Sequence, residues 1–135
     1  MIGIDTNVLV RYLVRDDAEQ AEAARELLEG LTRERPGFVC REVTVEVVWV
    51  LERAYRFGRA RIADVLLELV ATDCLVIESA DDVTRSALRY RRGGPGFSDL
   101  MIIAAASSAG AESLHTLDAR LARMDGATLV RTGRS

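Results

Sequence analysis

The sequence contains no lysine, and all 18 of its basic residues are arginine. This absence excludes every mechanism that needs a lysine amine, including the P-loop of nucleotide-binding proteins and a Schiff base with a carbonyl substrate. A G-x-G-x-x-G dinucleotide-binding fingerprint is also missing. Histidine occurs once, at His115, and we interpret it as structural because a lone histidine seldom makes a site.

Cysteine, long apolar runs and excess positive charge are scarce as well. The two cysteines, Cys40 and Cys74, lie among apolar residues, so we expect reduced thiols in a cytoplasmic protein. The longest apolar run, residues 100–106, is far shorter than the roughly 18–20 residues that cross a membrane. The first residues do not resemble a signal peptide. A net charge of −3 argues against a strongly basic nucleic-acid binder.

The residues that are present suffice for one α/β domain, which we expect to span residues 1–135. Short apolar segments predict strands at 1–4, 38–40, 74–78, 112–116 and 127–132. Helical spacing predicts helices at 6–14, 16–35, 41–55, 58–72, 79–92, 98–110 and 117–124. We expect Ser79 and Ser98 to cap two of these helices. Strands that alternate with helices predict a parallel sheet covered on both faces.

Three aspartates follow predicted strands or begin predicted helices: Asp5, Asp99 and Asp118. The carboxyl ends of parallel strands meet at one edge, where ligands bind in open α/β sheets. Glu46 lies among valines in a predicted helix, so we expect it to be partly buried. Each acid also has a structural interpretation, as a helix cap or, for Glu46, as a solvent-facing residue or a partner of Arg53.

Several carboxylates at one sheet edge would repel one another unless a cation offset their charge. Carboxylate oxygens without histidine or cysteine favour Mg²⁺ or Mn²⁺, and such ions commonly serve phosphoryl chemistry. The stretch "RYRRGGPGFSD" places arginines before Asp99: Arg89, Arg91 and Arg92. These arginines either lie in solvent at the end of a helix, where they complement the helix dipole, or contact an RNA phosphate beside the metal.

Four stretches resemble, in order, the acidic motifs of PIN-domain nucleases: "GIDTNVLV", "TVEVVWVL", "FSDLMIIAAA" and "HTLDARL". The resemblance covers almost the whole chain. Within that family the sequence is most similar to the VapC-type toxins of type II toxin–antitoxin systems, in its compact length and in the stretches "RYLVRDDAEQAEAA" and "VWVLERAY".

The resemblance implies a PIN-like three-layer α/β/α fold with a central parallel sheet of about five strands. It implies a divalent-metal-dependent endoribonuclease that uses Mg²⁺ or Mn²⁺. The catalytic, metal-binding acids would be Asp5, Glu46, Asp99 and Asp118, supported by Thr6, Asn7 and Thr116. The fourth acidic position varies in the family, so Asp118 is the weakest ligand candidate and could act through water.

The resemblance further implies a homodimer and a cognate antitoxin that blocks the site. We expect the antitoxin to insert an arginine among the acids and to use apolar anchors such as Trp49, Leu66 and Leu69. Two other interpretations stay open: a PIN-type RNA-processing nuclease without an antitoxin, and a non-catalytic PIN-like interaction module. Four retained acids argue against the second of these.

Overall fold

The computed structural model describes residues 1–133, so the last two residues of the predicted domain lie outside it. The described elements are β1 (Ile2–Gly3), α1 (Thr6–Val14), α2 (Ala18–Glu29), β2 (Gly37–Val39), α3 (Arg41–Arg53), α4 (Arg59–Ala71), β3 (Leu75–Ile77), α5 (Ala80–Arg91), α6 (Phe97–Ser108), β4 (Leu114–Thr116), a 3₁₀ turn η1 (Leu121–Arg123) and β5 (Ala127–Leu129). The sequence predicted these elements in this order. The helix expected at 117–124 was wrong, because only the single turn η1 forms there.

The five strands form two parallel sheets. One sheet has the order β1-β2-β3, with β2 in the centre, and the other consists of β4 and β5. The expectation of one central sheet of about five strands between two helical layers is therefore wrong for this structure. Each strand was predictable from its own apolar residues, whereas strand pairing depends on contacts that are distant in sequence.

The three-stranded sheet turns one apolar face to the helices. Gly3 pairs with Phe38 and Phe38 with Val76, so the residues that follow these three lie side by side on the opposite face. Those residues, Ile4, Val39 and Ile77, are all buried.

Helix α3 has a β-branched sequence but places Val47, Val48 and Leu51 at helical spacing, and all three are buried in the core. Burial of this apolar stripe outweighs the strand propensity of the valines.

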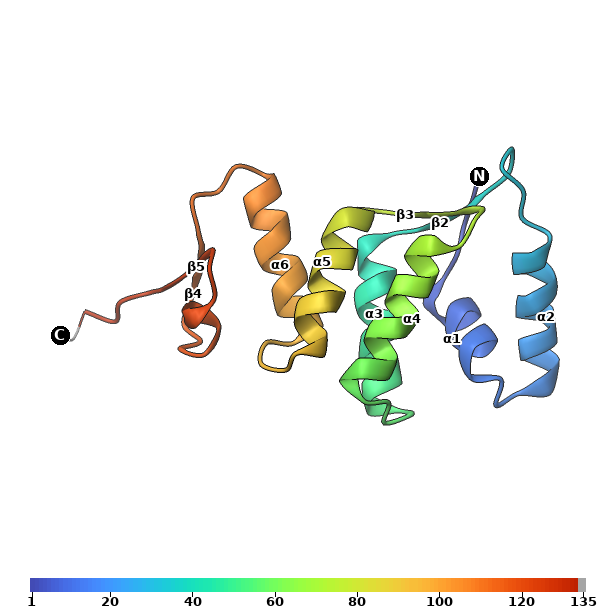
Figure 1. The fold of residues 1–135 in the computed structure, drawn as a ribbon, viewed down its shortest axis with the longest axis horizontal. Helices are drawn as coiled ribbons and strands as arrows, with labels where there is room; N and C mark the ends of the chain where they lie inside the picture. Colours follow the sequence, from blue (N-terminus) through green and yellow to red (C-terminus); the bar gives the residue numbers. More distant parts are fainter. Residues whose placement is uncertain (134–135) are drawn as a thin grey trace.

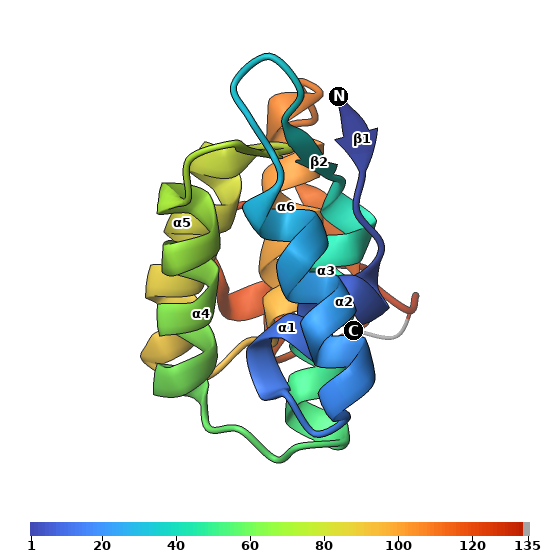
Figure 2. The ribbon, with the colours of Figure 1, turned by 90° about the vertical axis from the view of Figure 1, so that its right-hand side faces the viewer.

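Helices α5 and α6 stand between the two sheets. Contacts run in series from α1 to α3, from α4 to α5, from α5 to α6 and from α6 to β4. The molecule is consequently elongated, with the N-terminus near one end and the β4–β5 sheet at the other (Figure 1). Figure 2 shows β1 beside β2 at the margin of the molecule, next to α1 and α2. Among residues 1–133, no helix combines the length and apolar character needed to cross a membrane.

The two predicted serine caps have different outcomes. Ser79 is at the N-cap position of α5, as predicted, but its backbone is left-handed (φ 55°) and its side chain makes no capping hydrogen bond. Ser98 lies inside α6, which begins one residue earlier, at Phe97, after Gly96. The turn before α6 contains Gly93 and Gly94 at φ +87° and +88°, a conformation that favours glycine and that sets where the helix starts.

Candidate functional site

The first acidic pair is formed by Asp5 and Glu46. Asp5 lies two residues after β1 and caps α1, because its side chain accepts a hydrogen bond from the backbone N–H of Thr6 at 2.7 Å. Thr6 is buried, and its Oγ1 donates to Glu46 Oε1 at 2.5 Å. Thr6 therefore ties the end of β1 to the middle of α3. Asp5, Thr6, Asn7 and Glu46 line one cavity of about 390 Å³.

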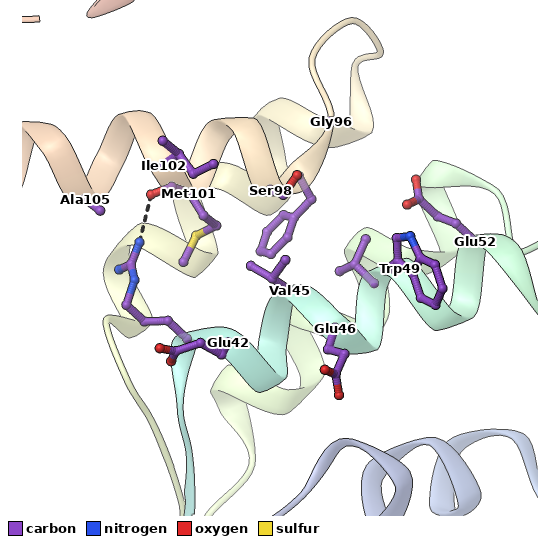
Figure 3. A pocket seen from close by; sticks show the side chains of 13 residues that line it. Glu42, Val45, Glu46, Trp49, Glu52, Gly96, Ser98, Met101, Ile102 and Ala105 are labelled. Atoms are coloured by element: carbon purple, nitrogen blue, oxygen red, sulfur yellow. Dashed lines mark hydrogen bonds between the residues drawn. The ribbon is translucent and has the colours of Figure 1, made fainter. Parts of the chain in front are cut away.

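Glu46 is exposed, so the prediction that it is partly buried was wrong. The neighbouring valines, Val47 and Val48, occupy the core face of α3 and leave Glu46 on another face of the helix. Figure 3 shows its carboxylate directed away from α6. An exposed carboxylate is accessible to a cation or a substrate.

A polar network that the sequence analysis missed lies beside this pair. Arg11 and Tyr55 line the same cavity as Asp5. The Tyr55 hydroxyl donates to Asp16 Oδ2 at 2.7 Å, and Arg11 Nη1 donates to Asp16 Oδ1 at 3.0 Å. The Tyr55 hydrogen bond lowers the pKa of Asp16 below its ordinary value. The position of Arg11, on α1 shortly after Asp5, was the signal available in the sequence.

The second acidic pair, Asp99 and Asp118, lines a separate cavity of about 460 Å³. Asp99 lies in the first turn of α6, and Asp118 follows β4. Three arginines line the same cavity: Arg89, Arg120 and Arg123. The cavity thus combines carboxylates with the positive charge that an anionic strand requires.

Asp118 also organises the chain after β4. Its Oδ1 accepts hydrogen bonds from the backbone N–H groups of Arg120 (2.9 Å) and Leu121 (3.2 Å). Its own N–H donates to Thr116 Oγ1 at 3.0 Å. The supporting role predicted for Thr116 therefore has a geometric basis in the turn, although its role at a metal stays a prediction.

The loop that leads to Asp99 is held by Arg59, which the sequence analysis also missed. Its guanidinium donates to the carbonyl oxygens of Tyr90 (2.9 Å), Gly94 (2.9 Å) and Pro95 (3.0 Å). It also lies over the Tyr90 ring, 4.4 Å from the centroid. An arginine at the start of α4 gives no sign of this role in the sequence, because the loop is more than 30 residues away.

The three arginines predicted as possible RNA contacts lie in different surroundings. Arg89 lines the cavity of Asp99 and Asp118. Arg91 forms an ion pair with Asp64 of α4, and Arg92 is exposed at the end of α5. Arg120 and Arg123 were missed, although both follow Asp118 within five residues.

The four acids are thus divided into two pairs, each with its own cavity. Their carboxylate oxygens have the chemistry that suits Mg²⁺ or Mn²⁺. Within residues 1–133, however, no three of the acidic, histidine and cysteine side chains lie close enough to hold a metal ion. The carboxylate oxygens are therefore suitable ligands for Mg²⁺ or Mn²⁺, but within residues 1–133 they are not close enough together to hold the ion.

A larger groove of about 540 Å³ lies between α3 and α6 (Figure 3). Its lining is mainly apolar and includes Trp49 and Ile102, which are 54% and 51% exposed. Two other residues considered as antitoxin anchors, Leu66 and Leu69, are buried in the core, so this part of the expectation was wrong.

The α/β scaffold thus carries Asp5 after β1, Glu46 on α3, Asp99 in the first turn of α6 and Asp118 after β4. The family model for the PIN domain matches residues 2–127, and the chain belongs to the PIN domain family. A comparison with curated proteins found no match. PIN domains are generally nuclease folds and usually depend on a metal.

Proposed function

We propose that the protein is a divalent-metal-dependent endoribonuclease that hydrolyses phosphodiester bonds in the presence of Mg²⁺ or Mn²⁺. One observation supports this proposal: the four stretches that resemble the acidic motifs of PIN-domain nucleases contain Asp5, Glu46, Asp99 and Asp118, in a chain that matches the family over residues 2–127. Each of the four lines a cavity.

Arginines near both acidic pairs support a nucleic-acid substrate. Arg11 lies with Asp5 and Glu46, and Arg89, Arg120 and Arg123 lie with Asp99 and Asp118. Phosphate oxygens are favoured partners of arginine, which binds them in a bidentate manner. Local positive charge lets a protein of net charge −3 accept an anionic strand.

The test is an RNA cleavage assay with the purified protein in Mg²⁺, in Mn²⁺ and in EDTA. Cleavage is expected with either metal and none in EDTA. Asp5→Asn and Asp99→Asn are expected to abolish cleavage while circular dichroism shows a retained fold. Asp73→Asn, which changes an exposed acid in the turn after α4, is the matched control and keeps full activity. Undiminished cleavage by folded Asp99→Asn would refute the assignment.

We further propose that this nuclease is the toxin of a toxin–antitoxin pair. The motif resemblance to VapC-type toxins supports this role. The groove between α3 and α6 supports a protein partner, because it offers the exposed Trp49 as an apolar contact and Glu42 and Glu52 as negative charges. An antitoxin segment with apolar residues and an arginine matches that surface.

The partner is tested by co-expression with the neighbouring gene, co-purification and a cleavage assay on the complex. We expect a tight complex without nuclease activity, and partial recovery of cleavage when the partner's arginine is replaced by alanine. Trp49→Ala should weaken the complex, whereas Leu88→Ala on α5, also an exposed apolar residue, should not. If no neighbour binds and expression leaves growth unharmed, an RNA-processing nuclease replaces the toxin.

A further inference from the structure

We propose that residues 53–61, which join α3 to α4, form a binding surface for single-stranded RNA. This arginine–aromatic segment would hold the strand beside the acidic pairs, with phosphate contacts from Arg56 and Arg61 and base stacking at Arg61 and Phe57. Its role in cleavage rests on the nuclease function proposed above, whereas RNA binding can be measured without cleavage.

The segment concentrates positive charge in a chain whose net charge is −3. Four arginines and no acid occur in its sequence, "RAYRFGRAR". Among residues 1–133, none of these four arginines takes part in an ion pair. Arg53, Arg56 and Arg61 are also exposed. Positive charge without a partner on a surface attracts polyanions, and phosphates are favoured partners of arginine.

The segment also presents a stacked arginine. The guanidinium carbon of Arg61 lies 3.6 Å from the centroid of the Phe57 ring. Tyr55 meets the same ring edge-on, with the two ring centroids 6.3 Å apart. Because Arg61 is exposed, the face of its guanidinium opposite Phe57 is open to a base, and its N–H edge is open to a phosphate. RNA-binding proteins stack unpaired bases on arginine planes and aromatic rings in this way.

Two of the arginines occupy positions where another residue would suit the fold better. Arg56 has a left-handed backbone (φ 56°), which glycine adopts at lower cost. Arg61 lies in the first turn of α4, which contains no acid, although the helix dipole favours an acid there. The stability of the fold therefore does not account for these two arginines, whereas contact with an anionic ligand does.

The segment contacts the surroundings of both acidic pairs. Tyr55 lines the cavity of the first acidic pair. Arg59 donates to the carbonyl oxygens of Gly94 and Pro95, and these two residues line the cavity of the second acidic pair. The turn between α3 and α4 and the loop before α6 lie at the same end of the molecule (Figure 1). An RNA strand on the segment is therefore placed next to the carboxylates.

A single RNA strand fits this surface better than a duplex or an acidic protein does. The bases of a duplex are stacked on one another, so they cannot stack on Arg61. A protein partner needs exposed apolar anchors, and the two aromatic side chains of the segment, Tyr55 and Phe57, are partly buried against the core. Phosphates and unpaired bases match both the charge and the stacked guanidinium.

RNA binding is measured by fluorescence anisotropy in EDTA, where the proposed nuclease does not cleave. The probe is an end-labelled single-stranded RNA of about 12 nucleotides, within the site sizes of single-strand binders. For Arg56→Gly with Arg61→Ala we expect the Kd to rise about tenfold, because two exposed ion pairs to phosphate are lost. The slope of log Kd against log salt concentration should fall by about 1.4, because each phosphate contact with a single strand contributes about 0.7.

The matched control is Arg33→Ala with Arg35→Ala. These two arginines are exposed and lie in the loop between α2 and β2, at the opposite end of the molecule (Figure 2). The control removes the same charge and should bind RNA like the wild type. Both double variants should melt at or near the wild-type temperature. Equal weakening of RNA binding in the two double variants, or weakening in neither, would overturn the surface.

Base stacking is tested with Phe57→Leu, which keeps an apolar side chain and removes the ring. The wild type should bind the single strand more tightly than a duplex of the same sequence. Phe57→Leu should lose about fivefold in affinity for the single strand, because stacking on the Arg61–Phe57 pair is weakened, and little for the duplex. Equal affinity of the wild type for the strand and the duplex would overturn the assignment to single-stranded RNA.

Cleavage kinetics show whether the surface serves the nuclease. Neither Arg56 nor Arg61 lines the cavities of the acidic pairs. Arg56→Gly with Arg61→Ala should therefore raise KM by about the same factor as the Kd and leave kcat near that of the wild type. A loss in kcat with an unchanged KM would contradict a role in holding the strand.

The outcomes separate the two proposals. A wild type that cleaves no RNA, but whose binding in EDTA depends on Arg56 and Arg61, would retain the surface and overturn the nuclease. An active wild type whose Kd and KM are unchanged in the double variant would retain the nuclease and overturn the surface. A double variant that binds RNA normally but loses a co-purified protein partner would assign the segment to that partner and overturn its role with RNA.

Discussion

The N-terminal region, residues 1–78, and the C-terminal region, residues 97–133, differ in how they are packed. The N-terminal region holds a continuous core, in which Leu9, Leu51 and Leu66 are completely buried. In the C-terminal region the strands β4 and β5 contain no buried residue, and Leu121 is the only buried apolar side chain after α6 among the described residues. The N-terminal elements are thus buried by one another and by α5 and α6, whereas β4 and β5 lie outside this core.

The same contrast applies to the acids. Glu46 is held by Thr6 and Asp5 caps α1, so the first pair is set by the local fold. Asp118 is held in the turn after β4, in the part of the C-terminal region that lies outside the core. The two acidic pairs therefore lie in parts of the molecule that are packed differently.

The largest effect is expected from truncation of the N-terminal core. Leu51→Ala should lower the free energy of unfolding by about 2–5 kcal/mol, because Leu51 is fully buried in the core. Leu117→Ala should cost less than about 0.5 kcal/mol within one chain, because that side chain is largely exposed. Urea denaturation of both variants at low protein concentration measures the difference. An equal decrease in the free energy of unfolding for both variants would contradict the difference in packing between the two regions.

A smaller effect is expected from the link between β1 and α3. Thr6→Val keeps the shape of the side chain and removes the hydrogen bond to Glu46, so the free energy of unfolding should fall by about 1 kcal/mol. RNA cleavage should fall in kcat more than in KM, because Thr6 positions a carboxylate. Thr6→Ser, which retains the hydroxyl, should restore cleavage. A valine variant with wild-type kcat would show that the link is only structural.

The smallest effect is expected from the Tyr55 hydroxyl, and it depends on pH. Because this hydroxyl lowers the pKa of Asp16, its contribution to stability is present above the ordinary carboxyl pKa and is lost as the pH falls through the lowered value. Tyr55→Phe should therefore be slightly less stable than wild type at pH 7 and equal to it in strong acid. Unfolding curves between pH 7 and pH 2 test this, and a pH-independent difference would rule it out.

Much of the local structure could be predicted from the sequence. The bounds of α1 were predicted to the residue, and α3 was correctly preferred over a strand, because buried apolar positions repeat with a helical period. The four acids were found because they follow strands or interrupt apolar segments. These sequence patterns are local, so each helix or strand can be predicted from its own residues.

The assembly of the sheets could not be predicted in the same way. The residues "SLHT" predict a strand, but they do not show which other strand pairs with it. Strand pairing depends on contacts with the rest of the chain. Arg59 and Tyr55 were missed for a related reason, since their partners lie more than 30 residues away. The exposure of Glu46 was mispredicted because flanking valines do not show which face of α3 meets the core.

The proposed function requires that acids from both regions act on one cation, and melting temperatures with and without Mn²⁺ test this requirement directly. A ligand that binds only the folded state raises the melting temperature, so Mn²⁺ should raise that of the wild type. This rise should be lost in both Asp5→Asn and Asp99→Asn, while the metal-free Asp99→Asn protein melts at or above the wild-type temperature. A full Mn²⁺ response in Asp99→Asn, with none in Asp5→Asn, would place the cation on the N-terminal pair alone and contradict the account.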